Sequence, residues 1–198
     1  MKIFFVKLEK ILGYHGTSLE NAKAIINEGF EPSLGDDHWL GNGVYFFIEG
    51  ISKNPNINAE KWAVVEAWDN KNKKLKYTQI GVIKAEIQVD ENNFLDLTTS
   101  DGVEILNYIL ESHKKTLKEK SKNISFLDGL ILNFAKQEGI LDFDVVKGNF
   151  YFKFDAESRK EDIKFRTPNC TICSVISPNK NIIDLEIVKE KNIEDEIN

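Results

Sequence analysis

The chain has 198 residues, of which 41% are hydrophobic and 29% charged, and its formal net charge is −6. This length fits one domain with a sizeable core, in which roughly 70% of the unfolded surface is buried. The negative charge argues against a broad basic surface for long nucleic acids or anionic membranes, but it leaves room for a site that binds one nucleotide.

The composition favours a reduced, intracellular protein. No apolar run approaches the ~20 residues of a membrane span, and the apolar stretch of residues 1–7 is too short for a signal peptide, so we expect a strand there. The only cysteines, Cys170 and Cys173, are three apart, and a strand would point them to opposite faces. Because there is no second cysteine pair, we expect no zinc or other metal site. Because the two cysteines are too close for a structural disulfide in a strand, we expect a reduced protein in the cytoplasm.

The first quarter of the chain predicts a strand, a helix, a loop and a second strand. Residues 11–15 form a short apolar run that predicts a strand. Thr17, followed three residues later by Glu20, is a capping box that predicts the start of a helix, and Gly29 predicts its end. After a loop, a glycine pair introduces a strand over residues 43–47.

The middle of the chain predicts further helices and one long strand. Residues 59–68 predict a helix, and the alternation of apolar residues over 77–89 predicts a strand. Asp101 opens an amphipathic helix, and Ser125 opens another that Gly139 closes.

The last third is mostly strand, and the order of elements is not a regular βαβ alternation. We therefore expect one α+β domain over residues 1–188, built on two small antiparallel sheets, and a charged tail over 189–198. A turn is expected at 147–149. The strands expected in this part are 143–146, 150–154, 163–165, 171–176 and 182–188.

Two short segments carry the chemistry. Tyr14-His15-Gly16-Thr17 ends the first strand, and Gly41-Asn42-Gly43 leads into Val44-Tyr45-Phe46 in the second. Each pattern alone is typical of a structural turn. Together they place an imidazole and a phenol beside glycines that let a ligand approach the backbone, so that a flat, polar ligand could lie between the two rings.

These segments, with Ile25-Ile26-Asn27-Glu28-Gly29-Phe30 between them, resemble the ADP-ribosyltransferase superfamily, in its diphtheria-toxin-like branch that includes the poly(ADP-ribose) polymerases. The resemblance covers residues 11 to about 68 well and the rest of the chain loosely. It implies split antiparallel sheets flanked by helices and an enzyme that uses NAD+ as substrate without a metal. Such an enzyme breaks the nicotinamide–ribose bond and transfers ADP-ribose to a protein or nucleic-acid acceptor.

The resemblance also implies a role for individual residues. His15 would bond a ribose hydroxyl, the backbone at Gly16 would hold the nicotinamide carboxamide, and Tyr45 would stack on the nicotinamide ring. Asn58 and Trp62 would supply a small polar group and a second aromatic wall, which suits a cationic ring through cation–π attraction. The implied NAD+-binding set is His15, Gly16, Thr17, Tyr45, Asn58 and Trp62.

The chain departs from the family at the glutamate that members carry at the start of the last core strand. Residues 166–175 contain no carboxylate, so Asn169, Cys170 or Thr171 would take that place. An amide or hydroxyl can orient a ribose but cannot act as a base, which favours single transfer, or loss of activity, over chain elongation. The expected catalytic set is His15, Tyr45, Asn169 and Thr171. Carboxylates that could substitute are Asp36, Asp37 and Glu66.

Two other functions fit the same motifs. One is a non-catalytic module that binds NAD+, ADP-ribose or a partner protein. The other is an RNA 2′-phosphotransferase, which shares the Tyr-His-Gly-Thr pattern but needs arginines for the RNA phosphate, and this chain has only Arg159 and Arg166. In the transferase interpretation, His38 and Trp39 lie in a loop that recognises the acceptor. The context would be a bacterial toxin or phage-defence effector restrained by an antitoxin or regulatory protein.

Overall fold

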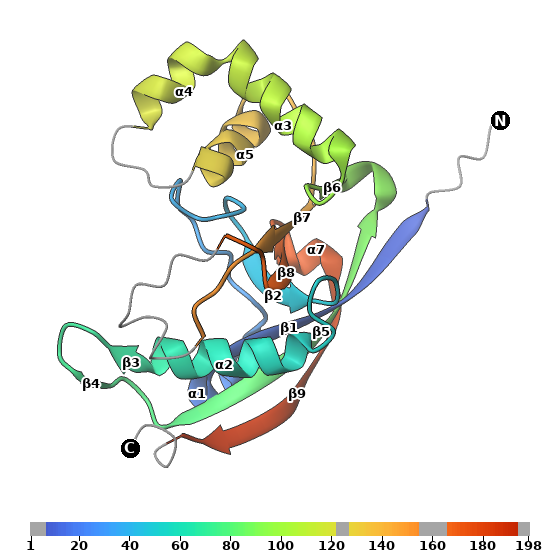
Figure 1. Cartoon of the computed structure of the whole chain (residues 1–198). Coiled ribbons are helices and arrows are strands. Elements are labelled where there is room, and N and C mark those ends of the chain that lie inside the picture. The colour runs from blue at the N-terminus through green and yellow to red at the C-terminus, as the bar shows by residue number, and fades with distance from the viewer. Residues whose placement is uncertain (1–6, 122–126, 155–165, 194–198) are drawn as a thin grey trace.

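A computed structural model of the chain describes residues 7–121, 127–154 and 166–193. Figure 1 shows helices packed around one large sheet, which confirms the expected α+β class. The elements are β1 (Leu8–Ser18), α1 (Leu19–Glu28), β2 (Val44–Ile48), α2 (Pro55–Ala67), β3 (Trp68–Asp69), β4 (Lys74–Leu75), β5 (Gln79–Asp90), the short 3-10 helix η1 (Glu91–Asn93), β6 (Phe94–Asp96), α3 (Ser100–Ser112), α4 (Lys114–Lys120), α5 (Leu127–Gln137), β7 (Val145–Phe150), β8 (Cys170–Val175), α7 (Pro178–Asn181) and β9 (Ile182–Asn192).

The sheet has seven strands in the order β6-β7-β8-β2-β1-β5-β9, and β3 and β4 form a separate hairpin. Its neighbours are antiparallel except for β6 and β7, which are parallel. The prediction of two small antiparallel sheets is therefore corrected to one mixed sheet in the described residues. Non-local pairing decides this, because β6 joins the sheet only through its parallel contact with β7.

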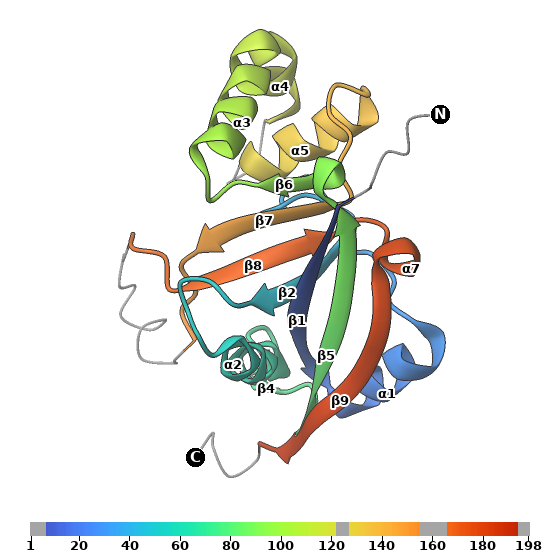
Figure 2. The same cartoon turned by 90° about the vertical axis from the view of Figure 1, so that its right-hand side faces the viewer.

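The sheet is nearly divided at its centre. Strands β1 and β2 pair only through Gly13 with Ile48 and Tyr14 with Phe47, whereas β1 pairs with β5 along its whole length. In Figure 2, β7, β8 and β2 run across the view while β1, β5 and β9 run down it. We call the place where β1 and β2 part, after Tyr14, the seam.

The two faces of the sheet are covered by different helices. One core cluster joins Ala22 of α1 to Phe46 and Ile83, and another joins Ala59 of α2 to Phe47 and to strands β7 and β8. Side chains alternate along a strand, so successive residues of β2 supply both cores. The seam therefore lies between two core clusters, one on each face of the sheet.

Several predicted boundaries differ from the observed ones. Because β1 stays paired with β5 through Ser18, this residue and not Thr17 caps α1, and its hydroxyl accepts from the Asn21 amide at 3.1 Å. Gly29 ends α1 as predicted, with a positive φ of 86°. Helix α2 begins at Pro55, four residues before the predicted start at 59, because proline suits the first helical turn.

The predicted turn at residues 147–149 is wrong. Strand β7 runs through it without a break, because it is paired with β8 throughout and with β6 over its first half. Gly148 serves close packing here: a Cβ would lie 2.8 Å from the Phe150 ring. The strand expected over 150–154 ends at its first residue.

Strand β9 continues to Asn192, so residues 189–192 of the expected charged tail belong to the sheet. The predicted strand at 163–165, the helix start at Ser125 and almost all of the predicted strand at 1–7 lie outside the described residues. Among the helices that the structure describes, none has the length and apolar character needed to cross a membrane.

Candidate functional site

His15 occupies the seam. At the point where the β1 and β2 backbones part, its Nδ1 lies 2.9 Å from the carbonyl oxygen of Tyr45. A strand carbonyl that has lost its ladder partner needs another donor, and the imidazole supplies it. Because a carbonyl only accepts, the proton lies on Nδ1, which leaves the Nε2 lone pair as an acceptor.

Burial keeps this imidazole neutral. It lowers the pKa of His15 below the ordinary 6.5, and the bond to the Tyr45 carbonyl opposes this only partly. The ring packs edge-on against Phe30 and Phe46, with centroids 5.2 Å and 6.0 Å away. His15 is thus a fixed, uncharged hydrogen-bond acceptor.

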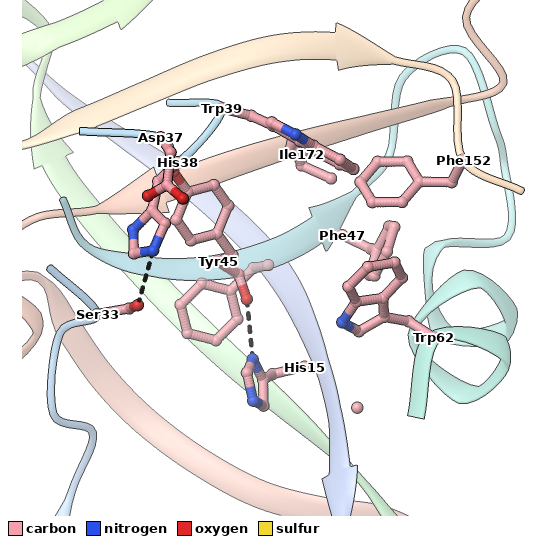
Figure 3. A pocket seen from close by; sticks show the side chains of 12 residues that line it. His15, Ser33, Asp37, His38, Trp39, Tyr45, Phe47, Trp62, Phe152 and Ile172 are labelled. Carbon is pink, nitrogen blue, oxygen red and sulfur yellow. Dashed lines mark hydrogen bonds between the residues drawn. The ribbon is translucent and has the colours of Figure 1, made fainter. Parts of the chain in front are cut away.

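A cavity of about 280 Å³ lies at the seam (Figure 3). Such a volume, with mostly aromatic walls and a few polar groups, is typical of a small-molecule site. Figure 3 shows Ser33, Asp37 and His38 gathered on one side, Phe47, Trp62 and Phe152 on the other, and Tyr45 and His15 between them. The lining residues are His15, Gly16, Ser33, Asp37, His38, Trp39, Tyr45, Phe46, Phe47, Trp62, Phe152 and Ile172.

The Tyr45 hydroxyl ties strand β2 to the loop before it. It donates to the Gly41 carbonyl at 2.6 Å and accepts from the Leu40 amide at 2.9 Å. Burial raises the pKa of Tyr45 to about 12, so the phenol stays protonated near neutral pH. Tyr45 therefore presents a neutral ring whose orientation is fixed by two backbone groups.

Helix α5 holds the other side of the same loop. The amide nitrogen of Asn133 donates to the Gly35 carbonyl at 3.1 Å and to Asp36 Oδ1 at 3.0 Å, while its Oδ1 accepts from the Asn42 backbone at 2.8 Å. A Cβ at Gly129 would overlap the His38 carbonyl, so this glycine lets the loop lie directly on α5. We call residues 35–42 the clamped loop.

Three aromatic rings from distant segments make one wall of the cavity. Phe152 lies between Trp39 of the clamped loop and Trp62 of α2, with ring centroids at 4.3 Å and 5.2 Å. The rings meet edge to face, as aromatic pairs prefer. This wall can pack against a flat ligand.

Four residues of the implied NAD+-binding set line the cavity, namely His15, Gly16, Tyr45 and Trp62. His15 and Tyr45 do not face each other across it, however, because the register at the seam places His15 on the Phe46 side of the sheet. They approach the cavity from opposite sides of the seam, so the interpretation of a ligand held between these two rings does not fit.

Gly16 lines the cavity and also admits α2. A Cβ at this position would overlap the Ala59 carbonyl. Thr17 and Asn58 are not among the lining residues. Asn58 is buried in α2, next to Ala59, and its Nδ2 has no hydrogen-bond partner within the described part of the chain.

The structure does not bring the expected replacements for glutamate to the cavity. Asn169 accepts from the Phe152 amide at 2.9 Å and donates to the Phe152 carbonyl at 2.8 Å. The buried hydroxyl of Thr171 donates to Asn149 Oδ1 at 2.7 Å and accepts from the Ile51 amide at 3.0 Å. The residue that β8 contributes to the cavity is Ile172, which lies opposite Phe47 in the sheet.

Of the three substitute carboxylates, Asp37 lines the cavity. Asp36 accepts from Asn133, and Glu66 lies 3.7 Å from the Lys76 ammonium, on the solvent side of α2. His38 also lines the cavity, with its Nε2 3.5 Å from the Ser33 hydroxyl.

Sequence reasoning missed Ser33, Phe47, Phe152 and Ile172. A signal for Phe47 was present, because it is two residues from Tyr45 in a strand and so shares its face. The alternation of Phe150, Phe152 and Phe154 was a similar signal, but nothing local indicated that this run meets α2.

The cysteines are buried, neither is in a disulfide, and they belong to different core clusters, as expected for opposite faces of β8. Burial raises the pKa of both thiols to about 12, so they are protonated near neutral pH. No group of three or more His, Cys, Asp or Glu side chains that could hold a metal ion occurs within the ranges that the structure describes.

No protein-family model matches this chain. The chain is similar to an uncharacterized protein of the archaeon Methanocaldococcus jannaschii, MJ0359, with 29% identity over 171 residues. The match spans 80% of this chain and 76% of that protein, whose name assigns it no activity.

Proposed function

We propose that this protein is an NAD+-dependent mono-ADP-ribosyltransferase, which cleaves the nicotinamide–ribose bond and transfers ADP-ribose to a macromolecular acceptor. One observation carries the proposal: His15, Gly16, Tyr45 and Trp62 come from three separate segments and line the same cavity. These are four of the six residues to which the family resemblance assigns contacts with NAD+.

The chemistry of the cavity supports this substrate. A nicotinamide ring bound to ribose is flat and positively charged, and aromatic walls attract such a ring through cation–π interaction. The lone pair on His15 Nε2 suits a ribose hydroxyl donor. Fixing ring and ribose in this way would lower the barrier through orientation and electrostatics.

The decisive experiment measures NAD+ binding by calorimetry, nicotinamide release, and transfer of labelled ADP-ribose to proteins and RNA of a cell extract. The sharpest variant is His15→Asn, whose amide can still donate to the Tyr45 carbonyl but lacks an acceptor at the Nε2 position. We expect it to lower nicotinamide release at least tenfold. The matched control is His113→Asn, between α3 and α4 and away from the cavity, which should leave the rate unchanged.

A second function has its own supporting observation, which is the apolar Ile172 where β8 meets the cavity. Without a carboxylate on β8, the protein could be a non-catalytic module that binds NAD+ or ADP-ribose. Tight binding without nicotinamide release would support the module and refute the transferase. Removal of the phosphate from a 2′-phosphorylated RNA, with release of nicotinamide, would instead indicate a phosphotransferase. A protein that neither binds nor cleaves NAD+ would refute the site assignment itself.

A further inference from the structure

Asp37 gives the cavity a negative charge. It is the carboxylate among the lining residues, and no lysine or arginine lines the cavity within the described ranges. Its carboxylate makes no hydrogen bond or ion pair with a residue that the structure describes. The two other titratable groups at the centre of the cavity, His15 and Tyr45, are held neutral by burial.

The position of Asp37 is fixed through its neighbours. On one side, Asp36 and Gly35 are bonded to Asn133 of α5. On the other, Leu40 and Gly41 are bonded to the Tyr45 hydroxyl. Asp37 itself is exposed at the edge of the cavity, and because its backbone is held at both ends, its carboxylate needs little reorganisation when positive charge develops beside it.

Resting on the proposed transferase function, we propose that Asp37 is the catalytic carboxylate of this protein and replaces the one that β8 lacks. When the bond between ribose C1′ and the nicotinamide nitrogen breaks, its electron pair goes to the nitrogen and neutralises the pyridinium ring. Positive charge is left on C1′ and the ring oxygen of the ribose, and the Asp37 carboxylate stabilises it. The acceptor then attacks C1′ with its own lone pair, and the proton that it loses passes to Asp37.

Asp37 lies with His38 and Ser33 on a solvent-exposed side of the cavity, since Asp37 and Ser33 are both exposed. His38 and Ser33 both lie beside Asp37 in Figure 3. An acceptor entering from solvent on this side would meet Asp37 before it met the aromatic wall formed by Trp62 and Phe152. The side that holds the nicotinamide ring and the side that receives the acceptor are therefore different walls of one cavity.

The test compares three variants of the full chain. Asp37→Asn removes the charge and keeps the shape, Asp37→Glu keeps the charge, and Asp36→Asn is the matched control, since an asparagine there can still accept from Asn133. We expect Asp37→Asn to lower kcat for nicotinamide release roughly 100- to 1000-fold, with the Kd for NAD+ within about threefold of the wild-type value. Asp37→Glu should recover at least tenfold of the lost rate, and Asp36→Asn should stay within about threefold of wild type.

The outcomes separate this inference from the function on which it rests. If the wild-type protein releases nicotinamide and Asp37→Asn does so at a similar rate, the role of Asp37 is refuted while the transferase stands. An equal loss in Asp36→Asn and Asp37→Asn would show that the loop matters and the charge does not, and would also refute it. A wild-type protein that binds NAD+ but releases no nicotinamide would refute both proposals.

Discussion

Replacing Tyr45 by phenylalanine isolates the hydroxyl that holds the clamped loop. The ring remains, but the Leu40 amide and the Gly41 carbonyl lose their partner. Leu40 is almost completely buried, with 1% of its surface exposed, so water cannot easily replace the lost bond to its amide. An unsatisfied buried group costs about 1–3 kcal/mol, and with two such groups we expect the free energy of unfolding to fall by about 2–4 kcal/mol.

Urea unfolding followed by tryptophan fluorescence measures this change, because Trp39 and Trp62 both line the cavity. With an m-value of roughly 2 kcal/mol per molar urea, the midpoint should fall by about 1–2 M. The matched control is Tyr108→Phe, since Tyr108 is 72% exposed on α3 and its loss should change stability by less than about 0.5 kcal/mol. If both variants shift the midpoint equally, the Tyr45 hydroxyl does not hold the loop.

Three further predictions concern packing and pH. Gly16→Ala places a methyl group against the Ala59 carbonyl, so we expect α2 to shift, stability to fall by about 1–3 kcal/mol in urea unfolding, and NAD+ binding to weaken in calorimetry. Because the pKa of His15 in the folded protein is below 6.5, the imidazole is protonated in the unfolded chain at a higher pH than in the folded one. His15 should therefore lower the stability of the protein as pH falls through 6.5, which would be measured as a falling urea midpoint. The pKa values of Tyr45 and Tyr77 are both raised from 10.0 to about 12, so the two phenols contribute to the free energy of unfolding below pH 10, and this contribution is lost as pH rises towards 12. Absorbance titration should show these two phenols ionising only near pH 12.

Local signals predicted those parts of the fold that depend on neighbouring residues. Gly29 could be assigned as a helix end because its positive φ is a local requirement. Gly148 could not be assigned, because lysine, glycine and asparagine in a row favour a turn, and only the pairing of β7 with β6 and β8 overrides that preference. The single mixed sheet was missed for the same reason.

The candidate site divides in the same way. His15, Tyr45 and Trp62 lie within residues 11–68, where the sequence motifs occur, and all three line the cavity. Phe152 and Ile172 come from the last third, and they reach the cavity only because β8 pairs with β2. Neither the alternation of apolar residues nor the spacing of motifs in the sequence predicts that β8 pairs with β2. Of the residues expected to replace the glutamate, Cys170 shares the face of Ile172 without reaching the cavity, while Asn169 and Thr171 are bonded to Phe152 and Asn149.

The seam explains why a cavity exists here at all. If β1 and β2 stayed paired beyond Tyr14, backbone amides would satisfy the Tyr45 carbonyl and the strands would leave no space between them. Because they part, the carbonyl takes its hydrogen bond from His15 instead, and this bond fixes the tautomer that leaves Nε2 as an acceptor. The separation of β1 and β2 thus accounts both for the cavity and for the tautomer of His15. A ligand that donates a hydrogen bond to Nε2 therefore depends on the separation of β1 and β2. In the proposed function, ribose binding would require this break in the sheet as well as the His15 side chain.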